Sequence, residues 1–524
     1  MRKKSIFLSL LSFFLLLIIH PTTSFADEDT FRVGMEAAYA PFNWTQTTDK
    51  NDAVPKSGEP GAYVGGYDVE VAKKIADGLD KKLEVVAIQW DGLVPALKSG
   101  KIDAIIAGMS PTDERRKEID FTDSYYDSHL VVIVQKDGEY ANATSLKDLK
   151  GAKITGQLNT FHYGVIDQIP EVQKQQAQNN FSAMRVALSS GVIDGYVSER
   201  PEGVTASQVN KNFKMLEFSD ENGFQTNPED VQTAVGLRKG DENLAKINTI
   251  LADLSADDRI QLMDTAVANQ PSSSDSEEET GLIHTFKTIL SQYGKLFLRG
   301  TGITLFIAVF STIAGTLIGL LVGVFRTLPQ SENLLARWLQ KIVNWLLTIY
   351  IEVFRGTPMM VQAMVIFYGL ALAFQIDLNR TVAALLIVSI NTGAYMSEIV
   401  RGGIFAVDKG QFEAAQAIGM THSQTMRKVV LPQVLRNILP AIGNESVINI
   451  KDTAVLSVIS VGDLFFQGTA AAGTNLLFFQ TFTIIGVIYL VLTITATRLL
   501  RLVEKKMDGP TSYVRNEDVQ EGAE

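Results

Sequence analysis

Two patterns of hydrophobic positions divide the chain. From Phe31 to about Asn269, short β-rich runs alternate with amphipathic helical stretches, as in soluble proteins. From about Gly300 to Leu502, long apolar runs dominate. The chain has 524 residues, and a single hydrophobic core stops growing at roughly 250 to 300 residues. The pattern therefore predicts a soluble half followed by a membrane half.

The soluble half follows the order β-α-β-α-β in the runs FRVGM, GYDVEVAKKIADGL, KLEVVAI, GLVPALKSG and KIDAIIAG. This order predicts a parallel sheet with helices on its faces. The pattern begins again at GAKITGQ, FSAMRVALSSG and VIDGYVSE. We therefore expect a bilobal α/β domain over residues 27–268, with lobe 1 at about 27–127 and 227–268 and lobe 2 at about 128–226. A ligand would bind between the lobes, where the loops at the carboxyl ends of the strands converge.

The membrane half contains five apolar runs that are long enough, or nearly so, to cross a bilayer. They lie at about 300–325, 358–376, 381–399, 437–460 and 477–499. The segment 338–352 is either an early part of the second span or an interfacial helix. With the soluble half outside, the basic segments 326–341, 401–436 and 498–506 lie inside, as the positive-inside rule requires. We expect an all-α transmembrane domain of about five helices over 297–508.

The remaining segments are a leader, a linker and a tail. Residues 1–26 have a basic start, an apolar run and small residues before Asp27, as in a cleavable secretory signal. The alternative is a retained anchor helix. Residues 269–296 combine a Ser-rich, acidic linker with an amphipathic stretch, LIHTFKTILSQYGKLF, which predicts a separate helix at the membrane surface. Residues 509–524 would form a cytoplasmic tail.

Composition excludes several kinds of chemistry. The chain has no cysteine, which rules out disulfides, thiol catalysis, cysteine metal sites and a lipid-modified cysteine after the leader. The membrane half is then the tether of the exported half. A formal net charge of -11 argues against nucleic acid as a partner. We expect no metal site.

Several motifs of the soluble half resemble the polar amino-acid family of solute-binding proteins, solute-binding family 3, which has the type II periplasmic-binding-protein fold. They are MEAAYAPFNW, GYDVEVAKKIA, WDGLVPALKSG, AGMSPTDERRKEIDFTDSYYDS and GVIDGYVSE, and the resemblance covers residues 31 to about 264. It implies that Arg115 binds the ligand carboxylate and that Glu199 binds the α-ammonium, unless Glu199 is a surface carboxylate. It also places further binding residues on the loops from the two lobes: Gly108, Met109, Ser110, Asn159, Thr160 and Phe161.

The chemistry of a free amino acid fits these positions. A guanidinium such as that of Arg115 can grip both carboxylate oxygens. Asn159 to Phe161 would begin a helix, whose free N–H groups favour an anion. Tyr39 and Trp90 fall where the family sandwiches the ligand side chain, and Glu36 falls where members that prefer cations place an acid. These three residues suit Lys, Arg or protonated His, although glutamine-binding relatives also keep an acid near Glu36 and the two aromatics could be core residues.

The segment EAAQAIGMTHSQTMRKVVLP resembles the coupling loop of ATP-binding-cassette (ABC) importer permeases, which docks in a groove of the ATPase subunit. The matching positions are Glu413, Ala414, Ala415, Gly419, Leu431 and Pro432. We expect the alanines and Gly419 to let two short helices pack closely, with Glu413 anchoring one of them. YIEVFRGTPMMVQ and NTGAYMSEIVRGGI further resemble the polar amino-acid branch of these histidine/glutamine-type permeases.

Two other features of the spans carry expectations. Gly315, Gly319 and Gly323 form one small-residue face, which favours close helix packing. Glu445 and Asp452 lie at or inside a span, where ionisable groups are costly and usually line a pathway. Asp452 could meet a cationic substrate in transit or form an internal pair with Lys451.

The resulting hypothesis is amino-acid import across the plasma membrane by a fused binding and permease subunit, with the binding domain extracellular. The preferred substrates are basic amino acids, and glutamine or glutamate is the alternative. The sequence has no GxxxxGK[ST] loop, so ATP would bind to a separate ATPase subunit and this chain would hold no cofactor. The resemblance implies two permease copies, hence a homodimer or a heterodimer with another permease.

Proteins of other classes share the bilobal fold. A channel would need a filter such as TVGYG, and a sensor kinase would need a cytoplasmic catalytic domain; neither is found in the sequence. An extracellular enzyme such as a dehydratase could use Glu36, Glu199 or His162 in the cleft. We interpret His162 as a surface or cleft-rim residue.

Overall fold

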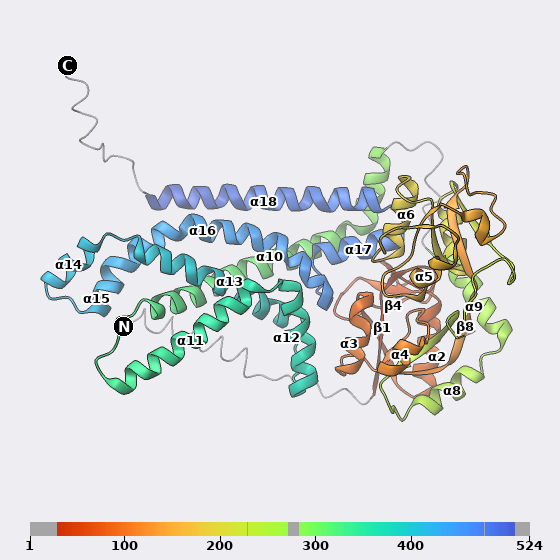
Figure 1. Cartoon of the computed structure of the whole chain (residues 1–524), viewed down its shortest axis with the longest axis horizontal. Helices are drawn as coiled ribbons and strands as arrows, with labels where there is room; N and C mark the ends of the chain where they lie inside the picture. The colour runs from red at the N-terminus through yellow and green to blue at the C-terminus, as the bar shows by residue number, and fades with distance from the viewer. Residues whose placement is uncertain (1–28, 228, 271–281, 476, 509–524) are drawn as a thin grey trace, which may run out of the picture. The chain divides into compact units, whose positions relative to one another are not determined.

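The computed structural model describes residues 29–508 except 228, 271–281 and 476 (Figure 1). The expected leader, most of the linker and the tail lie outside the described residues. The chain forms two compact units. One runs to Gly300 and includes Met364–Arg380 and Ser457–Ile485, and the other holds Thr301–Ala363, Thr381–Leu456 and the segment from Gly486. Each unit is described by itself.

The first lobe is built on a five-stranded sheet. Its strands, in spatial order, are β6 (Lys82–Ala87), β1 (Thr30–Met35), β7 (Ala104–Ile105), β14 (Gln232–Leu237) and β8 (Asp120–Asp127). β1 runs parallel to β6 and β7, whereas β14 runs antiparallel to β7 and β8. The parallel arrangement predicted for FRVGM, KLEVVAI and KIDAIIAG is confirmed, and the antiparallel pairing of β14 with β7 and β8 was not predicted. The chain leaves the lobe after β8 and re-enters it as β14, which inserts beside β8 in the opposite direction.

Helices and a small second sheet complete the first lobe. The helices include α2 (Tyr67–Gly78), α3 (Leu93–Lys98), α4 (Asp113–Glu118), α8 (Leu244–Ala252) and α9 (Ala256–Asn269). The four strands of the second sheet were not predicted, and they are β2 (Ala38–Tyr39), β3 (Asn43–Gln46), β5 (Tyr63–Gly65) and β4 (Val54–Pro55). This sheet fixes Tyr39 beside the loop that follows β1.

The second lobe is built on another five-stranded sheet. Its order is β11 (Gln173–Lys174), β10 (Lys153–Thr155), β12 (Gly195–Glu199), β9 (Leu130–Gln135) and β13 (Phe213–Glu217). β10 is parallel to β11 and β12, and β9 is antiparallel to β12 and β13, so this sheet is mixed as well. The prediction of two α/β lobes is confirmed.

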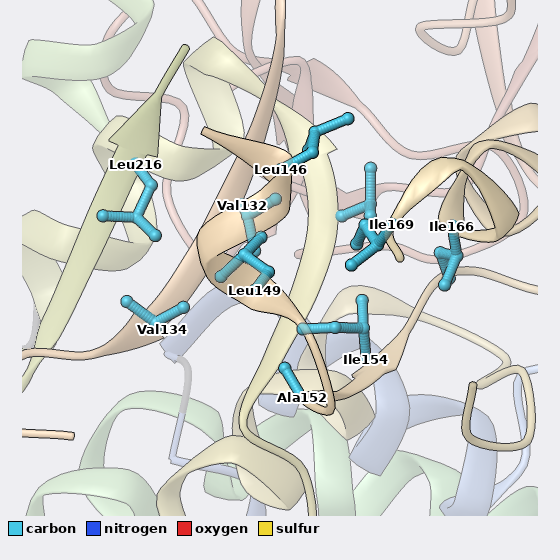
Figure 2. Close-up of a cluster of buried hydrophobic side chains, with 10 residues drawn as sticks. Val132, Val134, Leu146, Leu149, Ala152, Ile154, Ile166, Ile169 and Leu216 are labelled. Carbon is cyan, nitrogen blue, oxygen red and sulfur yellow. The ribbon is translucent and has the colours of Figure 1, made fainter. Parts of the chain in front are cut away.

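A hydrophobic cluster holds the second lobe together (Figure 2). Apolar residues of β9, β10, β12 and β13 pack against two short 3₁₀ helices, η2 (Leu146–Leu149) and η3 (Val165–Gln168). Ile154 of β10 and Ile166 of η3 are both fully buried. Their burial anchors the chain on either side of the segment that carries Thr160, Phe161 and His162.

The rest of the chain is helical. The helices are α10 (Leu282–Arg326), α11 (Leu334–Gly356), α12 (Met359–Phe374), α13 (Arg380–Phe405), α14 (Lys409–Ala417), α15 (His422–Thr425), α16 (Leu431–Asp452), α17 (Leu464–Asn475) and α18 (Phe478–Asp508). In the described residues, three helices are long and apolar enough to cross a membrane, or up to five if each of two bent pairs is one span. One bent pair, α11 with α12, turns by 114°. The ambiguous segment 338–352 lies within α11.

The expected separate surface helix before the first span is wrong. LIHTFKTILSQYGKLF is the beginning of α10, which continues to Arg326 as one helix of 45 residues. Residues 282–302 contain no proline, and their glycines at 294, 300 and 302 each cost only about 1 kcal/mol within a helix. Nothing in this stretch is therefore strong enough to end the helix.

The glycine face of α10 packs closely on α13, as predicted. A Cβ at Gly319 would lie 2.4 Å from Cβ of Met396, and a Cβ at Gly315 would lie 2.6 Å from Cβ of Thr392. Gly323 has the same relation to Val400, at 2.7 Å from its Cγ1. These helices approach so closely because one of them has no side chains at the contact.

Candidate functional site

The candidate ligand site is a cleft between the two lobes of the exported domain. The first lobe contributes loops after β1 and β7 and the turn η1 (Trp90–Gly92), and the second lobe contributes segments after β10 and β11. The lining residues are Glu36, Tyr39, Trp90, Gly108, Ser110, Arg115, Gln157, Thr160, Phe161, His162 and Phe181. Eight of the eleven residues predicted for this site line the cleft.

Arg115 lies on the first turn of α4, whose N-cap is Thr112. Its Nη1 donates to the carbonyl of Ser110 at 2.8 Å, and its Nη2 donates across the cleft to the carbonyl of Asn159 at 3.1 Å. The guanidinium also lies over the ring of Trp90, 5.1 Å from its centroid. Burial lowers the pKa of Arg115 to about 10, so it remains a cation at neutral pH and can bind a carboxylate.

Gly108 has a left-handed backbone with φ of +61°, and a Cβ there would lie 3.0 Å from Cε1 of Tyr39. Its N–H donates to the hydroxyl of Tyr125 at 3.0 Å. That hydroxyl donates to Asp68 at 2.8 Å, and Asn43 donates to the other oxygen of Asp68 at 2.7 Å. Burial raises the pKa of Asp68 to about 7. This buried network holds the ligand loop in place, and no local pattern in the sequence indicated it.

Glu36 is an acid whose negative charge receives little stabilisation from neighbouring groups. Burial, reinforced by the charge of Asp91, raises the pKa of Glu36 to about 8, although the backbone N–H of Trp90 partly opposes the rise. Tyr39 is buried, with its ring stacked at 4.8 Å from Phe181 and 5.0 Å from Phe42. Tyr39 thus packs as a core aromatic and lines the cleft as well.

Three predicted residues do not line the cleft. Met109 is buried behind the loop, and its carbonyl accepts from the N–H of Ala234. Asn159 lies at the rim, where its side-chain amide donates to Asp91 at 3.0 Å. Glu199 lies deeper, at the end of β12, and is 1% exposed. The surface alternative for Glu199 is therefore wrong.

The helix predicted after Asn159 is shorter than expected. Thr160 is the N-cap of α5 (Phe161–Gly164), which has a single turn before η3 begins. The dipole of a helix grows with the number of its aligned peptide groups. A single turn therefore attracts an anion mainly through its free backbone N–H groups.

The interpretation of His162 as a surface or rim residue is wrong, since it is 5% exposed. Its ring lies 4.3 Å from that of Phe161 and 6.3 Å from that of Phe181, measured between centroids. Its Nε2 is 3.5 Å from Oε1 of Glu199. Sequence reasoning also missed Gln157, although it ends the GAKITGQ run, and Phe181, which does not stand at the end of a predicted strand.

The predicted coupling loop is a helical hairpin of α14 and α15, followed by one π-helical turn (Met426–Val430) that leads into α16. Ala415 is buried, whereas Glu413, Ala414 and Ile418 are exposed, Ile418 by 74%. The expectation that Gly419 permits close packing is wrong, because a Cβ there would meet nothing within 4 Å. Its φ of +80° shows that glycine serves the turn.

Residues 31–265 match the family model described as bacterial extracellular solute-binding proteins, family 3. Residues 315–509 match the binding-protein-dependent transport system inner membrane component. The glutamine transport system permease protein GlnP of Escherichia coli (strain K12) is 37% identical over 213 residues, which cover 40% of this chain and 93% of that protein. The chain belongs to both families.

This fused transporter subunit resembles other amino-acid permeases and binding proteins. The arginine transport system permease protein ArtQ of Bacillus subtilis (strain 168) is 38% identical over 212 residues, covering 40% of this chain and 91% of that protein. A solved amino acid ABC transporter substrate-binding protein from Streptococcus pneumoniae Canada MDR_19A, bound to L-arginine, is 25% identical, with a TM-score of 0.40 and coverage of 46% of this chain and 95% of that one.

The families establish the coarse function. The chain is the binding and permease part of an amino-acid ABC transporter, a multi-pass membrane protein that works with an ATPase partner.

Within the permease half, Glu445 and Asp452 lie two turns apart on α16 and are both half-buried. The ion pairs within the described part of the permease half join Glu398 to Arg326 and Arg401 and do not include Asp452 with Lys451, which is exposed. Adjacent helix positions point apart, which explains this.

Proposed function

We propose that this transporter subunit captures basic amino acids outside the plasma membrane and imports them. The observation that carries the proposal is the acid Glu36, which is acted on by the charge of Asp91 and lines the cleft together with the half-buried ring of Trp90. A cationic ligand side chain would compensate Glu36, whose ionisation is opposed by burial and by Asp91. The ring of Trp90 would add cation–π attraction. Arg115 would hold the ligand carboxylate, and Glu199 the ammonium.

Glutamine or glutamate is the second candidate. One relative is named for glutamine and another for arginine, at nearly equal identity to this chain. A protonated Glu36 could donate a hydrogen bond to a side-chain amide or carboxylate oxygen. The cleft chemistry favours the cation because a cationic side chain can pair with the ionised form of Glu36 and is also attracted by Asp91.

The test is a thermal-shift panel of the full chain in lipid nanodiscs with arginine, lysine, histidine, glutamine and glutamate. We expect arginine and lysine to raise the melting temperature. For Glu36→Gln, at least ten times more ligand should be needed to produce the same shift, because the substitution removes the charge that faces the cation. Arg115→Ala should abolish every shift while the unliganded melting temperature stays similar. A shift with glutamine or glutamate alone would refute the basic preference.

For transport, we propose that the α14–α15 hairpin docks on the ATPase and that ATP binds only there. The exposed residues Glu413, Ala414 and Ile418 would form the contact. Two copies of this chain would complete the pathway, as a homodimer.

We further propose that Glu445 and Asp452 line the translocation path. Both are half-buried carboxylates on one face of α16, where a cationic substrate would find opposite charge. Asp452→Asn should slow uptake of lysine and arginine without changing their capture. Unchanged uptake in proteoliposomes would contradict this role.

A further inference from the structure

Two buried polar side chains meet at the deep side of the cleft. Glu199 is 1% exposed, and within the described residues neither of its carboxylate oxygens receives a hydrogen bond. His162 is 5% exposed, and its Nε2 has no hydrogen-bond partner among the same residues. The two groups lie 3.5 Å apart. A buried carboxylate is costly unless an opposite charge or a hydrogen-bond donor accompanies it.

The neighbour on the other side of His162 fixes which nitrogen carries a proton. The hydroxyl of Thr160 donates its single proton to the carbonyl of Gln157 at 2.8 Å. The same oxygen lies 3.2 Å from Nδ1 of His162, so it can only accept a proton from that nitrogen. Nδ1 is therefore protonated. Nε2 then faces Glu199 either as the second N–H of an imidazolium or as a bare lone pair.

The surroundings favour the imidazolium in the ligand-free cleft. The charge of Glu199 also acts on Tyr39, Asp68, Tyr126 and Arg115. These groups, from β2, α2, β8 and α4, include one cation, and the carbonyls of Ser110 and Asn159 already hold it. Glu36 lines the same cleft, while Phe161 and Phe181 present only aromatic rings to His162. A bare lone pair opposite Glu199 would add repulsion to an acid-rich site.

We propose that His162 is a ligand-binding residue. It pairs with Glu199 until the ligand takes its place as the partner of Glu199, and capture thereby releases a proton from His162. In the ligand-free form, the imidazolium pairs with Glu199. When the α-ammonium of the ligand pairs with Glu199, the Nε2 proton leaves to the solvent, and the bare Nε2 accepts a hydrogen bond from the ammonium. The inference rests on the proposed function, namely an amino acid bound in this cleft.

The sign of the pH dependence follows from the proton count. The free form holds one proton more than the complex, so raising the pH favours binding. Affinity should rise with pH, by up to about tenfold per pH unit wherever one proton is released per ligand. Any amino acid should show the effect, because every free amino acid carries the ammonium. Release of a proton from Glu36, in contrast, requires a cationic side chain.

The test is titration calorimetry of the full chain in nanodiscs with L-arginine and L-glutamine, in buffers of different ionisation enthalpy. The proton count per ligand is compared between wild type, His162→Gln and His129→Gln. Glutamine at position 162 keeps a hydrogen-bond acceptor but cannot titrate, and His129 is an exposed histidine of the same domain. We expect His129→Gln to match wild type, and His162→Gln to bind while releasing up to one proton fewer.

Each outcome decides the matter. Equal proton release from wild type and His162→Gln overturns the inference and leaves the binding function intact. Failure of wild type to bind any amino acid refutes the proposed function, and the inference falls with it. If His162→Gln does not fold, ¹⁵N-histidine NMR of the wild type replaces it. A change of His162 from doubly protonated to Nδ1-protonated on adding ligand supports the inference, and an unchanged resonance overturns it.

Discussion

At the scale of single residues, two acids stand out, Glu36 in the cleft and the buried Asp68 behind the ligand loop. Glu36 and Asp68 both have a raised pKa because burial disfavours their charged forms. Neither has a cationic partner in the described ion pairs. Asp68 accepts hydrogen bonds from Asn43 and Tyr125, whereas Glu36 lines the cleft, where a ligand can supply the opposite charge.

Glu36 should make the stability of the ligand-free protein depend on pH. Its pKa is about 8 when folded against 4.5 for the unperturbed group, so above pH 4.5 the folded state holds more protons than the unfolded state. The contribution of Glu36 to stability should therefore be fully present below pH 4.5 and be lost as the pH rises through about 8. Glu36→Gln should flatten this fall, as measured by melting temperature against pH. Asp68 contributes in the same direction, so some slope should remain. An unchanged slope in Glu36→Gln would show that Glu36 is not shifted.

Residue types at strand ends allowed much of the cleft to be predicted. Glu36 stands directly after the FRVGM run, Arg115 lies on the AGMSPTDERR segment that follows KIDAII, and the cleft contains both. His162 was misjudged because its burial depends on Phe181 and Glu199, which come 19 and 37 residues later in the chain. No local pattern carries that information.

At the scale of elements, the contact between α10 and α13 depends on glycine. Gly319→Ala should destabilise the membrane half by about 1–3 kcal/mol, because its Cβ would lie 2.4 Å from Cβ of Met396. The matched control is Gly302→Ala in the same helix, where a Cβ meets nothing within 4 Å. The control should be neutral or slightly stabilising, since alanine is the better helix former. Denaturation in detergent, followed by melting temperature, measures both. Equal effects of the two substitutions would show that the contact is loose.

The coupling hairpin leads to a second prediction at this scale. Ile418 is a large apolar side chain with 74% of its surface exposed at the turn after α14. Ile418→Asp should abolish substrate-stimulated ATPase activity of the assembled transporter and leave ligand capture unchanged. Ile418→Leu, which keeps the apolar contact, should retain most of that activity. Normal stimulation in Ile418→Asp would exclude Ile418 from the ATPase contact.

At the scale of the whole molecule, fusion gives every permease its own binding domain. A tethered domain meets its translocator at an effective concentration set by the linker and not by diffusion from solution. If the permease pairs with itself, each transporter carries two binding domains. Native mass spectrometry of the complex with its ATPase should find two copies of this chain. One copy together with a different permease chain would contradict the homodimer.

The sequence by itself determined the class of each half and the order of the halves, because hydrophobic periodicity and local motifs are properties of short segments. It also determined that Gly315, Gly319 and Gly323 form a packing face. Only the tertiary structure decided that β14 runs antiparallel beside β8, that α10 is a single helix from Leu282, and that Asp68, Tyr125 and Gly108 form one network. It likewise placed His162 beside Glu199. These features depend on contacts between distant segments, whose energies appear only once the chain has brought them together.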